Sequence, residues 1–333
     1  MKNFCTRELR IEMPLPTALY YSILQYQPEN LQFLREHCRV IEILNPDADR
    51  DEILAEIDLC FAPLGFYLGR AKMKRCSRLR AIATNTTGVP HIDMEEAAAR
   101  GIKVISLKDE TEFLRTITST AEHTWGLLLA LMRRSPWAHA DVLKGQWNRR
   151  PFGTLRMLSR LSLGIIGCGR LGSMVGRYGL AFGMQVAYFD PYLAESPAGF
   201  KRMGSLEDLV AFADVVSLHA PADETTYKMI SRDLLWKFKP GSYFINTARG
   251  ELVDEAALLE TLKTGRLAGA ALDVLDGEFV PGFQVSSHPL VAYAWEHDNL
   301  LLTPHIGGST IDAWGETERR VIELAYAYLR EGK

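Results

Sequence analysis

The stretch Leu163-Gly-Ile-Ile-Gly-Cys-Gly-Arg-Leu-Gly172 decides the fold of this chain. Residues 161–166 form an apolar run that predicts a buried strand, and residues 173–182 predict a helix. The glycines between them, in the order G-x-G-x-x-G, are Gly167, Gly169 and Gly172. Such glycines allow a tight turn and a close approach of the backbone to a pyrophosphate. The N-terminal N–H groups and dipole of the helix would then hold the anionic phosphates.

A second apolar run, residues 184–189, ends in Asp190, which lies 18 residues beyond Gly172 (190 − 172). An acid about 20 residues beyond the last glycine binds a ribose hydroxyl in dinucleotide sites. Its carboxylate would repel a 2′-phosphate, and residues 191–194 contain no Arg or Lys that could neutralise one. The glycine pattern alone is equally compatible with a turn that binds no ligand. The strand, the helix and the acid together favour a dinucleotide site, and they favour NAD over NADP.

The bulk composition limits the class of protein. The chain has 333 residues, which suggests two domains, and it is 47% hydrophobic and 24% charged, as in ordinary globular proteins. A net charge of −3 argues against nucleic-acid and membrane partners. No apolar run approaches ~18 residues. The N-terminus lacks a signal core and the five cysteines lack a C-x-x-C pair, so we expect a cytoplasmic protein with reduced thiols and no metal.

Short apolar runs alternate with amphipathic segments along the whole chain, which predicts an α/β fold with parallel, helix-covered sheets. In the first part we expect strands at 19–24, 40–44, 59–62, 80–83 and 103–106, with helices at 28–37 and 93–100. A long helix, 118–134, then leads through a basic, Trp-containing arm, 136–151, into the second part. Beyond the glycine turn we expect strands at 215–218, 242–246, 268–274 and 300–303, and helices at 254–264 and 312–330.

Residues 84–91 form a polar loop after the fourth strand of the first part. Ligands of open α/β sheets bind beyond the carboxyl ends of the strands, so this loop is a candidate anion cradle made of main-chain N–H groups. A plain surface turn fits the local sequence equally well. His91 lies in this loop, where it could contact a substrate, although a structural role is favoured.

Three polar residues follow predicted strands of the second part: Arg249, Glu278 and His305. A histidine titrates near neutral pH and could exchange the proton that accompanies a hydride, and a neighbouring carboxylate would fix its tautomer. A guanidinium can grip a carboxylate at two points. Taken singly, His305 and Glu278 would be interpreted as loop residues, and Arg249 could equally be a surface charge. The hypothesis rests on their shared position beyond strands of the domain that carries the glycine turn. We expect His219, which also follows a strand, to line the coenzyme crevice without taking part in catalysis.

Several segments together resemble the D-isomer-specific 2-hydroxyacid dehydrogenases, most closely the phosphoglycerate-dehydrogenase branch. The matching segments are Thr87-Gly88 with Ile92-Asp93, Ser119-Thr-Ala-Glu122, Gly167 to Gly172, His219-Ala-Pro221, Asn246-Thr-Ala-Arg-Gly-Glu-Leu-Val-Asp254, Ala271-Leu-Asp-Val274 with Glu278, and Thr303-Pro-His-Ile-Gly-Gly308. The resemblance covers most of the chain from Arg80 onward, whereas the earlier residues match the family only in pattern.

The resemblance implies a Rossmann-type doubly wound parallel sheet, residues 113–307, inserted into a flavodoxin-like α/β substrate domain formed by residues 1–112 and 308–333. It implies that His305 is the acid/base, Glu278 its partner and Arg249 the clamp on the substrate carboxylate. Thr87 and Gly88 would cradle that carboxylate. The positions that would contact NAD are Gly167, Gly169, Arg170, Leu171, Gly172, Asp190, His219, Ala220, Pro221, Thr247, Ala248, Asp273, Gly307 and Thr87. Homodimers joined through the nucleotide domain are common in this family.

The expected activity is therefore NAD-dependent interconversion of a D-2-hydroxy acid and its 2-keto acid. A non-enzymatic NAD-sensing protein on the same fold, or a dehydrogenase of another small anion, are the alternatives. Thr84 stands where phosphoglycerate dehydrogenases often have an Arg, and Pro90-His91 replaces their Asp-Asn. These departures argue against 3-phosphoglycerate as the substrate, and the sequence does not identify another acid.

Overall fold

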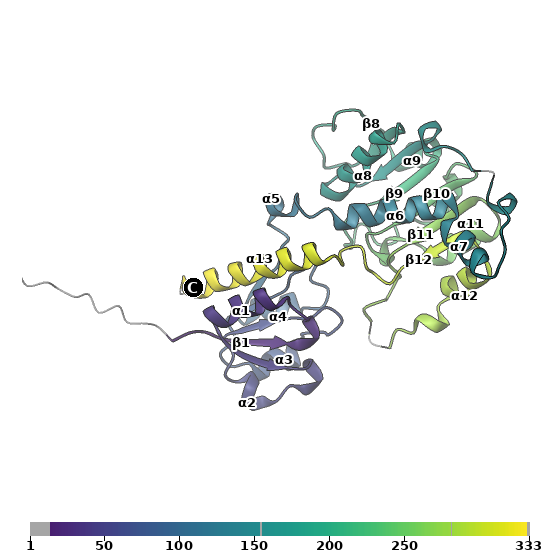
Figure 1. Ribbon diagram of the computed structural model, residues 1–333. Coiled ribbons are helices and arrows are strands. Elements are labelled where there is room, and N and C mark those ends of the chain that lie inside the picture. Colours follow the sequence, from purple (N-terminus) through teal and green to yellow (C-terminus); the bar gives the residue numbers. More distant parts are fainter. Residues whose placement is uncertain (1–13, 154, 281, 332–333) are drawn as a thin grey trace, which may run out of the picture. The chain divides into compact units, whose positions relative to one another are not determined.

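A computed structural model describes residues 14–153, 155–280 and 282–331, drawn in Figure 1. The chain divides into two compact units, one made of the residues up to Leu114 with those from Ile311 onward, and the other of Arg115–Thr310. The sequence-based boundaries at 112 and 307 lie two and three residues from this division (114 − 112 and 310 − 307). The first residues of the expected substrate domain, 1–13, lie outside the described part of the chain.

The first unit contains a five-stranded parallel sheet with the order β2-β1-β3-β4-β5. Its strands are β1 (Thr17–Tyr21), β2 (Arg39–Ile43), β3 (Leu59–Phe61), β4 (Ala81–Ala83) and β5 (Lys103–Ile105). Its helices are α1 (Pro28–His37), α2 (Asp51–Leu54), α3 (Arg70–Arg75), α4 (Met94–Ala99), α5 (Thr111–Leu114) and α13 (Ile311–Arg330). The three inner strands, β1, β3 and β4, are fully buried, as expected of a sheet that helices cover on both faces.

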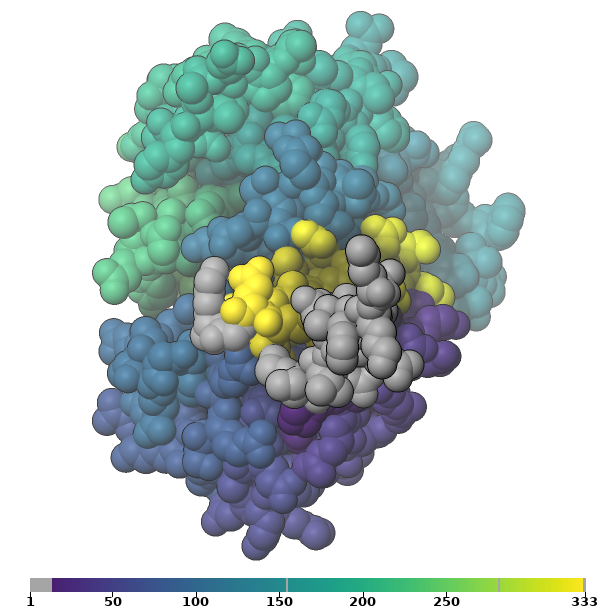
Figure 2. Space-filling model, turned by 90° about the vertical axis from the view of Figure 1, so that its left-hand side faces the viewer, coloured from purple at the N-terminus to yellow at the C-terminus, as the bar shows by residue number. Residues whose placement is uncertain are grey.

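Helix α13, which is yellow in Figures 1 and 2, returns from the far end of the sequence to complete this unit and packs on α1, β4 and β5. Its buried face includes Val321, Ile322 and Ala325. The buried carboxylate of Glu318 accepts hydrogen bonds from Gln27 N and Asn30 Nδ2, both at 2.9 Å. Apolar packing and buried hydrogen bonds therefore join two segments that are almost 300 residues apart in sequence.

The second unit contains a seven-stranded parallel sheet with the order β12-β11-β10-β9-β6-β7-β8. Its strands are β6 (Ser162–Ile166), β7 (Gln185–Phe189), β8 (Phe200–Arg202), β9 (Val215–Leu218), β10 (Ser242–Asn246), β11 (Leu267–Leu272) and β12 (Leu300–Leu302). Its helices are α6 (Ser119–Arg133), α7 (Ser135–Leu143), α8 (Arg170–Ala181), α9 (Leu206–Phe212), α10 (Arg232–Lys237), α11 (Glu255–Lys263) and α12 (Pro289–Glu296). The strand order reverses beside β6, so the glycine turn after β6 lies at the switch point where such sheets bind ligands.

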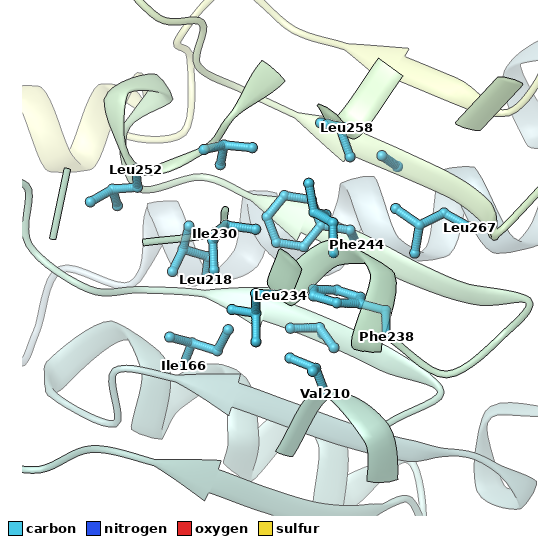
Figure 3. Close-up of a cluster of buried hydrophobic side chains, with 14 of the residues drawn as sticks. Ile166, Val210, Leu218, Ile230, Leu234, Phe238, Phe244, Leu252, Leu258 and Leu267 are labelled. Carbon is cyan, nitrogen blue, oxygen red and sulfur yellow. The ribbon is translucent and has the colours of Figure 1, made fainter. Parts of the chain in front are cut away.

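Apolar side chains cover both faces of this sheet. On one face, Ile166 and Leu218 pack with residues of α9, α10 and α11, and the rings of Phe238 and Phe244 meet edge to face at 5.8 Å (Figure 3). On the other face, α6 and α8 supply a second cluster that includes Trp125, whose ring stacks on the exposed Phe182 at a centroid distance of 4.7 Å. Burial on both faces explains why the strands read as unbroken apolar runs.

Several predicted boundaries shift in the structure. The first strand occupies Thr17–Tyr21 rather than 19–24, because Ser22–Leu24 turns into a 3-10 helix. Helix α8 starts at Arg170, three residues before the expected position, since Gly172 is helical. The expected arm at 136–151 begins as helix α7, which follows a left-handed residue, Arg134, with φ +53°. Strand β8 and helices α9, α10 and α12 were not predicted.

Four of the cysteines, Cys38, Cys60, Cys76 and Cys168, are buried free thiols, and Cys5 lies outside the described residues. Burial raises the pKa of Cys60 to about 11 and that of Cys76 to about 12, so these thiols stay protonated near neutral pH. Within the described ranges, no helix is both long and apolar enough to cross a membrane.

The three glycines of the turn have different steric roles. Gly167 has φ +81°, and a Cβ there would lie 2.7 Å from Ala220 N. A Cβ on Gly172 would lie 2.1 Å from the carbonyl oxygen of Gly167, so only glycine lets α8 pack this closely on the turn. A Cβ on Gly169 would meet no described atom within 4 Å, which leaves its backbone open to a ligand.

We expect Gly172→Ala to lower the free energy of unfolding by roughly 1–3 kcal/mol, because the added methyl group overlaps the Gly167 carbonyl oxygen. Gly126→Ala is the matched control: Gly126 is exposed in α6, and a Cβ there meets no described atom within 4 Å. Alanine at that position should stabilise the chain by about 0.4–1 kcal/mol. Urea unfolding of both variants tests the account, which an equal change in the two would contradict.

Candidate active site

The glycine turn and Asp190 form one hydrogen-bonded unit at the carboxyl ends of β6 and β7. Cys168 N, inside the turn, donates to Asp190 Oδ2 at 2.9 Å, and Tyr192 N donates to Asp190 Oδ1 at 2.9 Å. These hydrogen bonds orient the carboxylate toward the turn, where it could accept a hydrogen bond from a ribose hydroxyl. The open backbone at Gly169 and the first turn of α8 fit the pyrophosphate of a dinucleotide.

Arg170 and Leu171 occupy the first turn of α8. Arg170 Nη1 donates to the carbonyl oxygen of Ile117 at 2.9 Å, and burial lowers the pKa of this guanidinium. The Arg170 side chain thus contacts the segment before α6, and its main-chain N–H belongs to the helix N-terminus. This arrangement suits the predicted role of Arg170 and Leu171, which is to offer backbone groups to the coenzyme phosphates.

His219, Ala220 and Pro221 lie on the other side of the turn, where β9 ends. His219 N donates to Ile166 O at 2.7 Å, and His219 Nε2 lies 2.8 Å from Ser217 Oγ. Burial lowers the pKa of His219 to about 4, so this imidazole is neutral near pH 7. That His219 lines the coenzyme crevice without taking part in catalysis stays a prediction.

His305 and Glu278 are brought together as the sequence suggests. Nδ1 of His305 lies 2.7 Å from Glu278 Oε1, although the two residues are 27 positions apart. His305 has a left-handed backbone, with φ +53°, and Phe279 packs beside its ring at a centroid distance of 5.3 Å. A carboxylate on Nδ1 fixes the tautomer and leaves the opposite nitrogen, Nε2, to meet a substrate. A non-glycine residue held at positive φ indicates that the surrounding structure imposes this conformation.

Asp273 anchors the loop that carries His305. Its buried carboxylate accepts hydrogen bonds from Thr303 Oγ1 at 2.6 Å, Ile306 N at 2.9 Å and Gly307 N at 2.7 Å. His123 Nε2 lies 3.2 Å from Asp273 Oδ1. Burial works to raise the pKa of Asp273, but the hydrogen bonds outweigh it and hold that pKa below its ordinary value. The structure gives Asp273 a positioning role, and its contact with the nicotinamide stays a prediction.

Arg249 follows β10 in the segment that also contains Thr247 and Ala248. Its Nη1 donates to Ala248 O at 2.6 Å, and Asn246 Nδ2 donates to Arg249 O at 2.9 Å. The next residue, Gly250, packs directly on the loop that leads to Glu278, because a Cβ there would lie 2.1 Å from the carbonyl carbon of Leu275. The Arg249 segment and the Glu278 loop are therefore neighbours at the same edge of the sheet.

A second histidine–carboxylate pair supports the Glu278 loop, and no local sequence pattern predicts it. Glu255, at the start of α11, accepts a hydrogen bond from Asp276 N at 2.9 Å, and its other oxygen lies 3.1 Å from His288 Nε2. Burial raises the pKa of Glu255 to about 7 and lowers the pKa of His288. The contact of His123 with Thr303 spans 180 positions, and no local sequence pattern links the two residues.

The predicted substrate residues Thr87 and Gly88 belong to the first unit, in the loop after β4. Thr86 Oγ1 donates to Gly88 O at 2.6 Å and lies 3.1 Å from the hydroxyl of buried Thr84. These contacts shape the loop from within. His91 is 4% exposed and is packed inside the unit, and burial lowers its pKa. In the part of the chain that the structure describes, no cluster of three or more His, Cys, Asp or Glu side chains could hold a metal ion.

Comparison with known proteins identifies relatives of both the sequence and the fold. The family model for "D-isomer specific 2-hydroxyacid dehydrogenase, NAD binding domain" matches residues 125–307. The D-3-phosphoglycerate dehydrogenase of Bacillus subtilis is 34% identical over 278 residues, which is 82% of this chain and 50% of the relative. The glyoxylate reductase of Thermofilum pendens is 34% identical over 307 residues, 89% of this chain and 85% of the relative. This chain spans about half the length of the phosphoglycerate dehydrogenases that it matches.

Among solved structures, a D-lactate dehydrogenase from Aquifex aeolicus, complexed with NAD and lactic acid, superposes with a TM-score of 0.81. It is 28% identical, and the match covers 94% of this chain and 96% of that one. An NADPH-dependent glyoxylate/hydroxypyruvate reductase from Sinorhizobium meliloti gives a TM-score of 0.80 at 26% identity, covering 94% and 95% of the two chains. The fold class predicted from the sequence is confirmed.

We expect Asp273→Asn to lower the free energy of unfolding near neutral pH by about 1–3 kcal/mol. Both carboxylate oxygens of Asp273 accept hydrogen bonds, whereas an amide can accept them only through its single oxygen. The pKa of Asp273 is lower in the folded chain than its unfolded value of about 3.9. The carboxylate therefore stabilises the fold at pH values above about 3.9, and this stabilisation is lost as the pH falls through the folded pKa. The stability gap between wild type and variant should therefore narrow as the pH falls from about 5 through the unfolded pKa of about 3.9 and toward the lower folded pKa. Urea titrations across that range measure it, and a constant gap would contradict the charge-based account.

Proposed function

Because the chain belongs to the D-isomer-specific 2-hydroxyacid dehydrogenase family, as its motifs predicted, we propose that it interconverts a D-2-hydroxy acid and its 2-keto acid with NAD. The observation that carries this proposal is the 2.7 Å contact between His305 Nδ1 and Glu278. It lies at the same carboxyl edge of the parallel sheet as the open glycine turn. A coenzyme crevice and an oriented acid/base are the two parts that such a reaction needs.

When bound, the reduced coenzyme supplies the hydride that reaches the carbonyl carbon of the keto acid. Protonated His305 then donates its Nε2 proton to the carbonyl oxygen, while Glu278 holds Nδ1 and stabilises the imidazolium. The guanidinium of Arg249 binds the substrate carboxylate and stabilises the developing oxyanion. In the reverse direction neutral His305 accepts the hydroxyl proton.

We also propose Thr87 and Gly88, through their main-chain N–H groups, as a carboxylate-binding loop of the first unit. The Thr86 hydroxyl, which holds the Gly88 carbonyl, supports a preformed cradle at this point. Thr84 is a buried, uncharged side chain where phosphoglycerate dehydrogenases often have an Arg, so the substrate we propose is a small 2-keto acid without a phosphate.

The enzyme assignment is tested with a panel of small 2-keto acids, assayed by the loss of NADH absorbance with NADPH in parallel. His305→Ala should lower kcat by about 10²- to 10⁴-fold. NADH binding should persist in this variant, because the turn and Asp190 are unchanged. Exposed His139, on α7, provides the control His139→Ala, which should keep full activity. Near-normal turnover by His305→Ala would refute the acid/base role, and NADH binding without turnover of any panel member would favour a non-enzymatic sensor.

A cytoplasmic homodimer joined through the nucleotide domain also belongs to this proposal. Its support is a set of exposed apolar side chains after α6, of which Leu143 is 74%, Trp147 91% and Met157 64% exposed. Apolar and aromatic side chains that are solvated in one chain are typical of subunit contacts. Light scattering should give twice the mass of one chain, and Trp147→Ser should shift the population toward the monomer. A wild-type chain that stays monomeric at high concentration would contradict this part.

A further inference from the structure

A depression opens at the carboxyl ends of β7 and β8, next to the glycine turn. It has a volume of about 500 Å³. Its lining residues are Phe189, Asp190, Pro191, Arg202, Met203 and Gly204. Each of the six is either the last residue of β7 or β8 or one of the two residues that follow that strand. The depression is therefore built by the edge of the sheet that carries Asp190.

Arg202 reaches Asp190 because β8 pairs in parallel with β7, with Tyr188 opposite Arg202. Met203 N donates to Tyr188 O at 2.9 Å and fixes this register. The guanidinium of Arg202 then donates through Nη2 to the main-chain oxygen of Asp190 at 3.3 Å. The residues that directly follow Asp190 contain no cationic side chain. Arg202, twelve positions after Asp190 in sequence, nevertheless lies beside it in the fold.

The order of the strands shows which part of a dinucleotide would lie here. Gly167 N donates to Phe189 O, and Cys168 N donates to the Asp190 carboxylate, so the turn, the carboxylate and the depression follow one another along the sheet edge. With the pyrophosphate on the turn and the ribose at Asp190, the 2′ position and the adenine extend over β7 and β8.

We propose that Arg202 is a specificity-determining residue for the coenzyme, acting at the 2′ side of the adenosine ribose. The proposal rests on the coenzyme site proposed above. Asp190 repels a 2′-phosphate, whereas Arg202 attracts one, so the preference between NADH and NADPH is set by the opposition of these two charges. Arg202 is exposed, and its attraction is therefore moderate and weakened by salt.

The test compares the binding of 5′-AMP and 2′,5′-ADP, which differ only in the 2′-phosphate, by isothermal titration calorimetry at low salt. Arg202→Ala should weaken the binding of 2′,5′-ADP relative to that of 5′-AMP by about three- to tenfold. Arg202→Lys should retain most of the difference, since it keeps the charge. The ratio of kcat/KM for NADPH to that for NADH should fall in Arg202→Ala by a similar factor.

Lys201→Ala is the matched control, because Lys201 neighbours Arg202 on β8 but its ammonium lies over the Phe212 ring, 5.3 Å from the ring centroid. It removes the same net charge and should leave the ratio of the two affinities unchanged. Asp190→Asn should favour 2′,5′-ADP, and most of that gain should disappear when Arg202→Ala is added.

An equal loss of both ligands in Arg202→Ala would overturn the proposal, because it would indicate a role unrelated to the 2′ position. An effect of Lys201→Ala as large as that of Arg202→Ala would overturn it as well, since general surface charge would then be the cause. In both cases 5′-AMP binding by the wild-type chain leaves the coenzyme site itself intact. Failure of the wild-type chain to bind 5′-AMP would remove that site, and this proposal with it.

Discussion

The approach of helix α8 to the glycine turn is the constraint on which the second unit depends. Any side chain on Gly172 would overlap the carbonyl oxygen of Gly167, so backbone packs directly against backbone. That contact fixes the helix N-terminus over the end of β6, where Cys168 N can also hold the Asp190 carboxylate. Because all seven strands are parallel, the loops that follow β9, β10, β11 and β12 begin at the same edge of the sheet. One steric requirement thus places an anion site and the polar loops together.

Much of this arrangement follows from the sequence. Unbroken apolar strands alternating with helices predict parallel sheets, and parallel sheets place the residues after each strand at one edge. This is why Asp190, Arg249 and His305 could be proposed as site residues without a structure. The pairing of His305 with Glu278 was expected, and the two side chains are in contact.

The features that were missed depend on long-range pairing or on weak local patterns. Strand β8 has only three residues, two of them exposed, so it lacks an apolar run that could reveal it. Without β8, the position of Arg202 beside Asp190 cannot be deduced. The contacts of His123 with Asp273 and of Glu255 with His288 join distant segments through side chains alone. The helix was expected to start at Ser173, but it starts at Arg170, because the close packing of the helix on the turn favours a helical glycine at 172.

Two histidines at strand ends have different surroundings and therefore different chemistry. His219 faces the Ser217 hydroxyl, and burial keeps its imidazole neutral. His305 faces a carboxylate, which can compensate a positive charge on the ring. The loop that holds this carboxylate is in turn fixed by Glu255 through the main chain of Asp276. Orientation of the acid/base therefore depends on a second layer of polar contacts as well as on its direct partner.

The return of α13 to the first unit has a consequence for synthesis on the ribosome. All of Arg115–Thr310 is translated before Ile311–Arg330, so the nascent first unit waits for the helix that covers β4 and β5. During that interval the apolar surface that will receive Val321 and Ala325 stays uncovered, as a docking surface for chaperones or a route to aggregation. The second unit is continuous in sequence and can complete its core as soon as Thr310 has emerged.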